Sequence, residues 1–380
     1  MKQRIGKPSY IILVFLALLA LMLFFLAEKS QTPRKSEYYS EKIQAAQLAK
    51  KAQETIKQEI NRRGLVIDVR NDPNLTGLIG PQYSLITTDR SNIRDKLITT
   101  NPNLAAELVA LMHRAQLKSG DPIAVMFTGS LPGANIAVLA ACKVLGIKPI
   151  IITSVGSSSY GANYEDFTWL DMEDVLVKGG LWEFKSTAAS LGGSDDQGRG
   201  LSPEGRILLE NAIKRSGAEF INSSDAKPDE STLDLNINKR IKIFDNKRND
   251  LKYKAVINVG GGLAAVGSTQ NARLIPPGFS ASLKGREFPA KGALNILASR
   301  RIPVIHLLDM TSFADRHGLP IEITPEPEIG KGPVFVKEQY SVVSTTIYTI
   351  ILLAVLIAAV RLDLRYYIVK NKHLFVRKPR

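Results

Sequence analysis

Long apolar runs lie near both ends of this chain. Residues 10–27 contain no charged residue, proline or glycine, and residues 342–360 contain no charged residue. A helix needs roughly 20 apolar residues to cross the hydrocarbon layer of a bilayer. We therefore predict a transmembrane helix at each run. The alternatives are a cleaved signal peptide for the first run and a buried helix of a soluble domain for the second.

Shorter apolar patterns between these runs alternate between the helix and strand periods. Residues 37–63 have apolar residues at helical spacing, which predicts an amphipathic helix rising from the membrane, and residues 65–69 predict a short strand. A helix, a buried strand, a second helix and a second strand are then predicted at residues 103–120, 123–130, 131–146 and 148–158. A strand–helix–strand unit favours a parallel sheet.

The residues that follow repeat this alternation. We predict a helix at residues 202–217 and a weak strand at 218–224. A strand that runs into glycines is predicted at 253–262, and a helix followed by a strand at 291–310. The charged residues 225–249 are predicted to form a surface excursion. The predicted fold class is α/β with a Rossmann-like parallel sheet, built either as two similar halves, 64–199 and 200–319, or as one large doubly wound sheet.

Basic residues are concentrated beside the two apolar runs. The net charge is +14, yet residues 28–340, with 40 basic and 35 acidic residues, account for only +5. Basic clusters mark the cytoplasmic side of a membrane helix. Both termini are therefore predicted to be cytoplasmic and the bulk of the chain extracytoplasmic, in a two-pass protein of the cell (inner) membrane. This distribution does not indicate a nucleic-acid partner.

The predicted organisation follows from these patterns. It begins with a cytoplasmic segment (1–9), a transmembrane helix (10–27) and a linker with the amphipathic helix (28–63). The outer α/β domain (64–319) follows. A Pro-rich linker (320–341), a transmembrane helix (342–360) and a basic cytoplasmic tail (361–380) complete it. The chain has 380 residues, of which 44% are apolar, and this is enough for one large core or two smaller ones.

Side chains that bind metals are sparse. The single cysteine, Cys142, excludes a disulfide within the chain and a cysteine-rich metal site. The histidines show no ligand-like spacing; they are His113, His306, His317 and His373. Neither G-x-G-x-x-G nor G-x-x-x-x-G-K-[ST] occurs, so no dinucleotide or P-loop site is predicted. The sequence predicts no cofactor and no metal.

A glycine loop between a predicted strand and helix is the strongest local signal. Such loops lie at the carboxyl edge of a parallel sheet, where ligands bind, and helix N-termini attract carboxylates and phosphates. The predicted ligand-binding residues of this loop are Gly129, Ser130, Gly133 and Asn135. The alternative is a tight turn with serine as a helix cap.

Ser130 is also a candidate nucleophile, because hydrolases place a serine between a strand and a helix. Asp171 and His306 would complete a triad in the chain order Ser–Asp–His. The expected G-x-S-x-G is absent, since Thr128 and Pro132 occupy the positions of its two glycines. Even without this motif, the position of Ser130 keeps an extracytoplasmic serine hydrolase or transferase as an alternative function.

Two further loops follow predicted strands. Their candidate ligand-binding residues are Gly156, Ser157, Ser158 and Asn163 in one loop, and Gly260, Gly261 and Gly262 in the other. Loops at this edge often carry function. Acidic residues after the first of them are equally consistent with a solvated surface. A shared cleft formed by all three loops would favour a binding site.

Three segments of this region resemble a known family. They are FTGSLPGANIAVLAACKVLGIKPIIITSVGSSSYGANYEDFTWLDME, RGLSPEGRILLENAIKRSG and VINVGGG, at residues 127–173, 199–217 and 256–262. The chain resembles the poly-γ-glutamate system protein family, membrane proteins encoded with bacterial poly-γ-glutamate synthesis and export components. The resemblance covers most of residues 40–320 and both apolar runs. It implies no catalytic residues.

What the resemblance implies is a role in making or exporting this anionic capsule polymer, with poly-γ-glutamate and other synthesis or export subunits as partners. The residues are compatible with this role, since helix N-termini and glycine-rich loops bind carboxylates. Three hypotheses therefore stand: an accessory component that binds the polymer, a hydrolase or transferase acting on polymer or envelope amides, and a structural assembly subunit.

Overall fold

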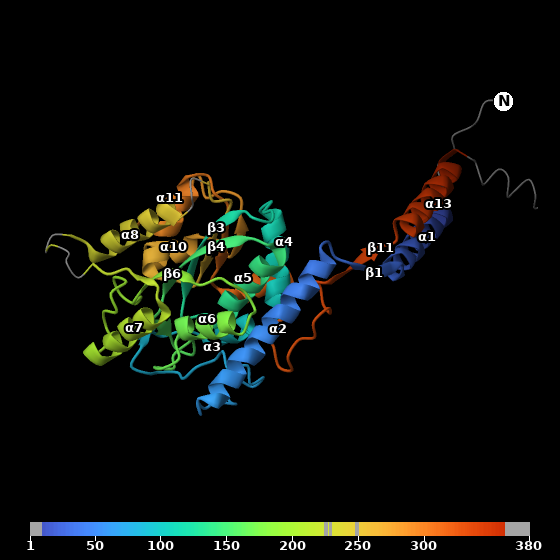
Figure 1. Cartoon of the computed structure of the whole chain (residues 1–380). Helices are drawn as coiled ribbons and strands as arrows, with labels where there is room; N and C mark the ends of the chain where they lie inside the picture. The colour runs from blue at the N-terminus through green and yellow to red at the C-terminus, as the bar shows by residue number, and fades with distance from the viewer. Residues whose placement is uncertain (1–9, 224–226, 228–229, 248–250, 362–380) are drawn as a thin grey trace, which may run out of the picture. The chain divides into compact units, whose positions relative to one another are not determined.

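The structure is a computed structural model that describes residues 10–223, 227, 230–247 and 251–361 (Figure 1). The predicted cytoplasmic segment 1–9 and nearly all of the basic tail lie outside the described residues. The described residues fall into two compact units. One is Ser36–Phe335, and the other combines the segment that ends at Lys35 with the segment that begins at Val336.

The terminal unit contains both predicted spans as helices. Helix α1 (Tyr10–Lys29) contacts α13 (Val342–Arg361), and both are long and apolar enough to cross a membrane. Strand β1 (Gln31–Lys35) pairs antiparallel with β11 (Val336–Tyr340). These two strands lie where the sequence predicted linkers. Pairing is favoured there because the two segments leave neighbouring helices, and each satisfies backbone groups of the other.

A single sheet organises the Ser36–Phe335 unit. In the described residues it has seven strands in the order β7-β6-β4-β3-β8-β10-β9, parallel except for the edge strand β9. The strands are β3 (Pro122–Thr128), β4 (Lys148–Ser154), β6 (Ser186–Ser190), β7 (Glu219–Phe220), β8 (Val256–Val259), β9 (Gly278–Ser280) and β10 (Val304–Leu307). Strands from both predicted halves belong to this one sheet.

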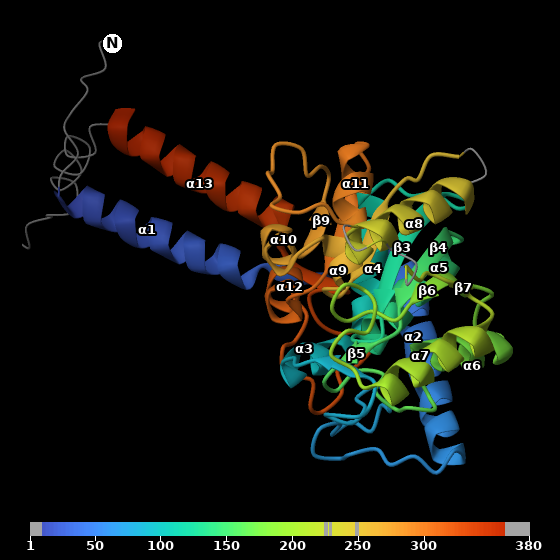
Figure 2. The same cartoon turned by 90° about the vertical axis from the view of Figure 1, so that its left-hand side faces the viewer.

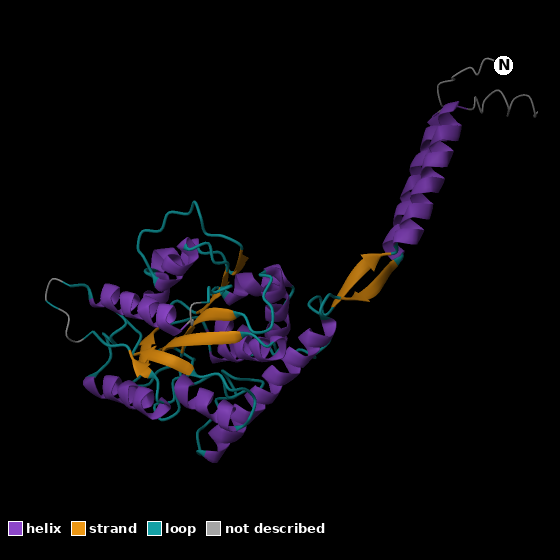
Figure 3. Ribbon diagram, turned by 45° about the horizontal axis from the view of Figure 1, so that its top comes forward, coloured by secondary structure: helices purple, strands orange, loops and turns teal. Residues whose placement is uncertain are grey.

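Helices lie on both faces of the sheet (Figure 2, Figure 3). Alternate residues of a strand point to opposite faces. Phe127 of β3 packs edge-on against Trp169 on one face, where the ring centroids are 5.8 Å apart. On the other face Met126 belongs to a buried cluster with Phe244 and Leu297. Every residue of β3 is buried, as expected of a central parallel strand.

The helices of this unit share their apolar sides with the sheet and with one another. They are α2 (Tyr39–Arg62), α3 (Ile93–Thr99), α4 (Asn103–Arg114), α5 (Pro132–Leu145), α6 (Trp169–Lys178), α7 (Pro203–Ser216), α8 (Thr232–Lys247), α9 (Leu263–Val266), α10 (Thr269–Leu274), α11 (Ala293–Ser299) and α12 (Met310–His317). A separate two-stranded parallel pair joins β2 (Thr87–Asp89) to β5 (Ser157–Ser158).

Two sequence predictions are wrong. Residues 65–69 form no strand, and Val66 is exposed. The predicted surface excursion 225–249 contains α8, which buries Ile237 and Phe244. Its apolar residues have helical spacing, but the many charges between them obscure the pattern.

The two ends of the Ser36–Phe335 unit are joined directly. The backbone N–H of Ser36 donates to the carbonyl oxygen of Phe335 at 2.8 Å. The side chain of Ser36 donates to the carbonyl oxygen of Val334 at 2.9 Å. The chain therefore enters and leaves this unit at one place.

Candidate functional site

The strand order reverses between β3 and β8. From β3 the chain adds β4, β6 and β7 on one side, and then crosses to add β8 and β10 on the other. In open α/β sheets, ligands bind at the carboxyl ends of the strands on either side of such a reversal. The loops that follow β3 and β8 are the first and third glycine loops of the sequence. We call the region formed by the carboxyl ends of β3, β4 and β8 the switch-point edge.

The three predicted loops meet at this edge. A Cβ atom built on Gly129 would lie 2.3 Å from the carbonyl oxygen of Val155. A Cβ on Gly260 would lie 2.6 Å from Oγ1 of Thr128, and one on Gly262 would lie 3.5 Å from Oγ of Ser154. A Cβ on Gly129 would collide with a backbone oxygen and one on Gly260 with a threonine side chain, so the loops are in close contact.

Several predicted ligand-binding residues hold the loops together instead of facing outward. Gly133 packs against α3, since a Cβ there would lie 2.3 Å from the carbonyl oxygen of Thr99. Asn135 is fully buried and its Nδ2 donates to the carbonyl oxygen of Thr128 at 2.9 Å. These contacts explain why both residue types are needed at the start of α5, without any ligand.

The second loop has buried members of the same kind. Gly156 leaves no space for a Cβ, which would lie 2.7 Å from the carbonyl oxygen of Leu191. The buried Ser157 donates to the carbonyl oxygen of Ser158 at 2.8 Å. Asn163 is also buried, and its Nδ2 donates to the same oxygen at 3.0 Å. These three residues fix the backbone around Ser158.

Four of the predicted residues are accessible at the edge. Ser130, Ser158 and Gly262 are partly exposed, and Gly261 is exposed. The backbone N–H of Ser158 donates to Oγ of Ser130 at 3.0 Å, which brings the first two loops into direct contact. Within residues 10–223, 227, 230–247 and 251–361, the N–H groups of Gly261 and Gly262 have no acceptor. They are available to a ligand.

Lys96 completes this group and was missed in the sequence. It lies on α3, and its Nζ donates to Oγ of Ser158 at 2.8 Å and to the carbonyl oxygen of Ser130. The side chain is 2% exposed. Lysine is rarely buried without a partner, so no residue-type rule pointed to it. Asn92, which caps α3, was the available signal for the helix but not for the buried amine.

Burial changes the protonation of this amine. Desolvation lowers the pKa of Lys96 to about 7, and the neighbouring carboxylate of Asp95 partly opposes this shift. Asp95 is itself held by Thr311 at the start of α12, whose N–H and O–H both donate to Oδ1. Near neutral pH a substantial fraction of Lys96 is therefore an uncharged amine, which can accept a proton.

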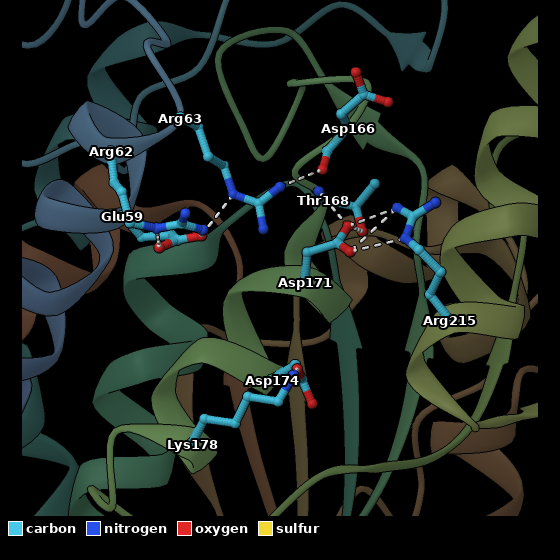
Figure 4. A network of polar contacts seen from close by, with 9 residues as sticks. All are labelled: Glu59, Arg62, Arg63, Asp166, Thr168, Asp171, Asp174, Lys178 and Arg215. Carbon is cyan, nitrogen blue, oxygen red and sulfur yellow. Dashed lines mark hydrogen bonds and ion pairs between the residues drawn. The ribbon is translucent and has the colours of Figure 1, made fainter.

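The predicted triad is not assembled. Asp171 accepts hydrogen bonds from the N–H and Oγ1 of Thr168, both at 2.8 Å, and forms an ion pair with Arg215 (Figure 4). His306 is bonded through Nδ1 to Nδ2 of Asn258 at 3.0 Å. Burial lowers the pKa of His306 to about 4, so it is neutral. Asp171 therefore caps α6 and links it to Arg215 of α7, whereas His306 lies in the interior of the sheet. Neither side chain contacts Ser130.

The acidic segment after the second loop is mostly paired. In Figure 4, Lys178 lies against the carboxylate of Asp174, whereas Arg63 contacts Asp166 at its backbone carbonyl oxygen and not at its carboxylate. Glu173 is buried, and its carboxylate accepts from the N–H and Oγ of Ser186 at 2.7 and 3.1 Å. Burial raises the pKa of Glu173 to about 7. These groups stabilise α6 and do not form part of the switch-point edge.

A buried ion pair supports the same edge from inside. Arg240 of α8 and Asp196 are each 1% exposed and lie 2.9 Å apart. Nη2 of Arg240 also donates to Oγ of Ser154 at 3.0 Å and to Ser190. This network joins the carboxyl ends of β4 and β6 to α8. This pair could not be predicted, because both residues lie in segments rich in charge.

The chemistry of the edge consists of two serine hydroxyls, free backbone N–H groups and, behind the serines, a buried lysine amine. Among the described residues, no group of three or more His, Cys, Asp or Glu side chains is arranged to hold a metal ion. In comparisons with protein-family models, with curated proteins and with solved structures, no match to this chain was found.

Proposed function

We propose that the chain is a membrane-anchored component of a bacterial poly-γ-glutamate synthesis or export system, and that its α/β unit binds the anionic polymer at the switch-point edge. The choice of poly-γ-glutamate as the ligand is supported by the resemblance to that family of residues 127–173, 199–217 and 256–262. The observation that carries the binding site is the meeting of three glycine loops on both sides of the strand reversal. If the sheet is Rossmann-like, its ligand is expected at this same edge.

The accessible groups of the edge suit a carboxylate. Backbone N–H groups of Gly261 and Gly262, together with the hydroxyls of Ser130 and Ser158, are hydrogen-bond donors, and successive N–H groups in glycine-rich turns form anion-binding concavities. Because Gly261 has no Cβ, a polymer backbone can approach closely. Lys96, when protonated, adds a positive charge behind the two serines.

The membrane topology belongs to the same proposal. The two apolar helices have the length to cross a bilayer, and basic residues flank the first run on its N-terminal side and the second on its C-terminal side. Both termini are then cytoplasmic and the α/β unit extracytoplasmic, in the cell (inner) membrane. The partners are the other subunits of the system and the polymer itself.

Polymer binding by the full chain in detergent micelles or nanodiscs tests this function. Biolayer interferometry with immobilised poly-γ-glutamate should show binding that weakens as NaCl is raised, since screening reduces charge attraction. Ser130→Ala should weaken binding. The matched control is Ser299→Ala, an exposed serine at the end of α11, which leads into the opposite edge of the sheet. No binding at low salt would refute the proposal.

A further inference from the structure

Ser158 and Lys96 are placed as a nucleophile and a base. Their Oγ and Nζ atoms are 2.8 Å apart, which is within the reach required for proton transfer. The serine is partly exposed, whereas the lysine is 2% exposed. The serine residue therefore contacts solvent, while the amine behind it is shielded from water.

Ser130 positions both members of the pair. Its carbonyl oxygen accepts from Nζ of Lys96, and its hydroxyl accepts from the N–H of Ser158 at 3.0 Å. The backbone of Ser158 is also fixed by Nδ2 of Asn163 at 3.0 Å and by pairing with Asp89 of β2. Nucleophile and base are thus held by groups from three segments, which is the pre-organisation that catalysis requires.

We infer that Ser158 is the nucleophile and Lys96 the general base of an amide hydrolase built into the switch-point edge. Serine–lysine pairs perform this chemistry on unrelated folds. This assignment replaces Ser130 by Ser158, since it is Ser158 whose hydroxyl contacts a base. Ser130 becomes a positioning residue.

The reaction balances with these groups and water alone. The uncharged Lys96 amine takes the hydroxyl proton of Ser158 while Oγ bonds to the amide carbonyl carbon. The carbon–nitrogen bond then breaks, the Lys96 ammonium returns the proton to the leaving amine, and an acyl ester remains on Ser158. Water attacks this ester, its proton passes through Lys96 to Oγ, and a carboxylic acid is released.

The charge environment of Lys96 suits this role. Its pKa of about 7 leaves much of the amine free to act as a base near neutral pH. The charged group that acts on it is Asp95 of its own helix, which α12 holds through Thr311. The first and second loops present neutral groups to it, the carbonyl oxygen of Ser130 and the hydroxyl of Ser158.

The substrate class rests on the proposed function. If the edge receives poly-γ-glutamate, the bonds brought to Ser158 are the amides that link its units, and the carboxylate beside each amide meets the N–H groups of Gly261 and Gly262. The reaction would shorten or release polymer chains. The nucleophile–base pair itself stands on geometry that is independent of the polymer.

Labelling by a fluorophosphonate probe tests the pair in the full chain in detergent. Mass spectrometry should locate the label on Ser158, and Ser158→Ala should abolish it. Lys96→Met should slow labelling about 100-fold or more, the usual contribution of a general base. Lys96→Arg keeps a charged donor that cannot deprotonate, so it should be equally slow. Ser299→Ala should label at the normal rate.

Near-ultraviolet circular dichroism of each variant shows whether it folds. If the lysine variants do not fold, the role of Lys96 is tested by the pH dependence of labelling in the unaltered chain. The labelling rate should rise with pH through about 7 as Lys96 loses its proton. Label on Ser130, no label on the folded chain, or a normal rate in folded Lys96→Met would overturn the inference. If Ser158 is labelled but poly-γ-glutamate is neither cleaved nor bound, the assignment of Ser158 and Lys96 as nucleophile and base stands, and poly-γ-glutamate is refuted as the substrate.

Discussion

One oxygen of Asp95 accepts hydrogen bonds from both the N–H and the hydroxyl of Thr311, at 3.1 and 2.9 Å. This contact joins α3, which carries Lys96, to the helix that follows β10. It therefore links the two sides of the switch-point edge.

Thr311→Val should destabilise the protein by about 1.5 kcal/mol, since a hydrogen bond to a charged group is lost while the shape is kept. Thr311→Ser retains the hydroxyl and should have nearly unaltered stability. Urea unfolding in detergent, followed by tryptophan fluorescence, measures both. Equal stability of the valine and serine variants would show that the contact contributes little.

The two glycines Gly133 and Gly261 should respond differently to alanine. A Cβ on Gly133 meets the carbonyl oxygen of Thr99 at 2.3 Å, whereas one on Gly261 meets only the two methyl groups of Leu308, at 3.8 and 3.9 Å. Gly133→Ala should lower the melting temperature strongly. Gly261→Ala should leave it unchanged and weaken poly-γ-glutamate binding. A binding constant unaffected by Gly261→Ala would remove this loop from the proposed site.

Replacing one member of the buried Arg240–Asp196 pair should be costly. Arg240→Leu leaves a buried carboxylate without its partner, and such changes cost about 3–5 kcal/mol. The double variant Arg240→Leu, Asp196→Leu should recover much of this loss. The exposed pair Lys143–Glu183, with side chains 43% and 69% exposed, is the control; Lys143→Leu should cost less than about 1 kcal/mol. Chemical denaturation measures all three variants.

Glu173 should make stability fall as pH rises. Its pKa is raised from an ordinary 4.5 to about 7, so between these values the folded state binds more protons than the unfolded state. The favourable contribution is complete below pH 4.5 and is lost as pH rises through 7. In Glu173→Gln this dependence disappears, so the melting temperature of the variant relative to wild type should increase between pH 5 and pH 8. Parallel curves would contradict the raised pKa.

Membrane topology is testable with a single engineered thiol. Cys142 is fully buried and does not compete for reagent in the folded chain. In Ser299→Cys, the new thiol should react in intact cells with a membrane-impermeant maleimide if the α/β unit is extracytoplasmic. Labelling that appears only after the membrane is opened would place the unit in the cytoplasm.

Strong periodic patterns made much of the fold predictable. The segment from β3 through α5 to β4 and the helix α7 were predicted because apolar runs and caps such as Ser202 coincide there. Helix α8 was not, since its buried face includes Asn236 and Arg240, polar residues that are satisfied only by distant partners. Patterns along a chain do not show such partners.

The candidate site was predictable only as a location. The glycine loops indicated where the candidate site lies, because the carboxyl ends of parallel strands gather at one edge of the sheet. Which residues are accessible was not predictable: Gly133 and Gly261 are the same residue type, and the neighbour at Thr99 distinguishes them. Lys96 comes from a separate short helix, and its contact with Ser158 depends on how that helix packs.

The hydrogen bond between Ser36 and Phe335 brings the two ends of the Ser36–Phe335 unit together, which matters for engineering this chain. A module whose two ends touch can be inserted into a host at one point without separating the host's own segments. Without this module, the remainder is a simple helical hairpin closed by the β1–β11 ribbon. Such an arrangement permits the module to be exchanged or transplanted as one piece while its anchor is left unaltered.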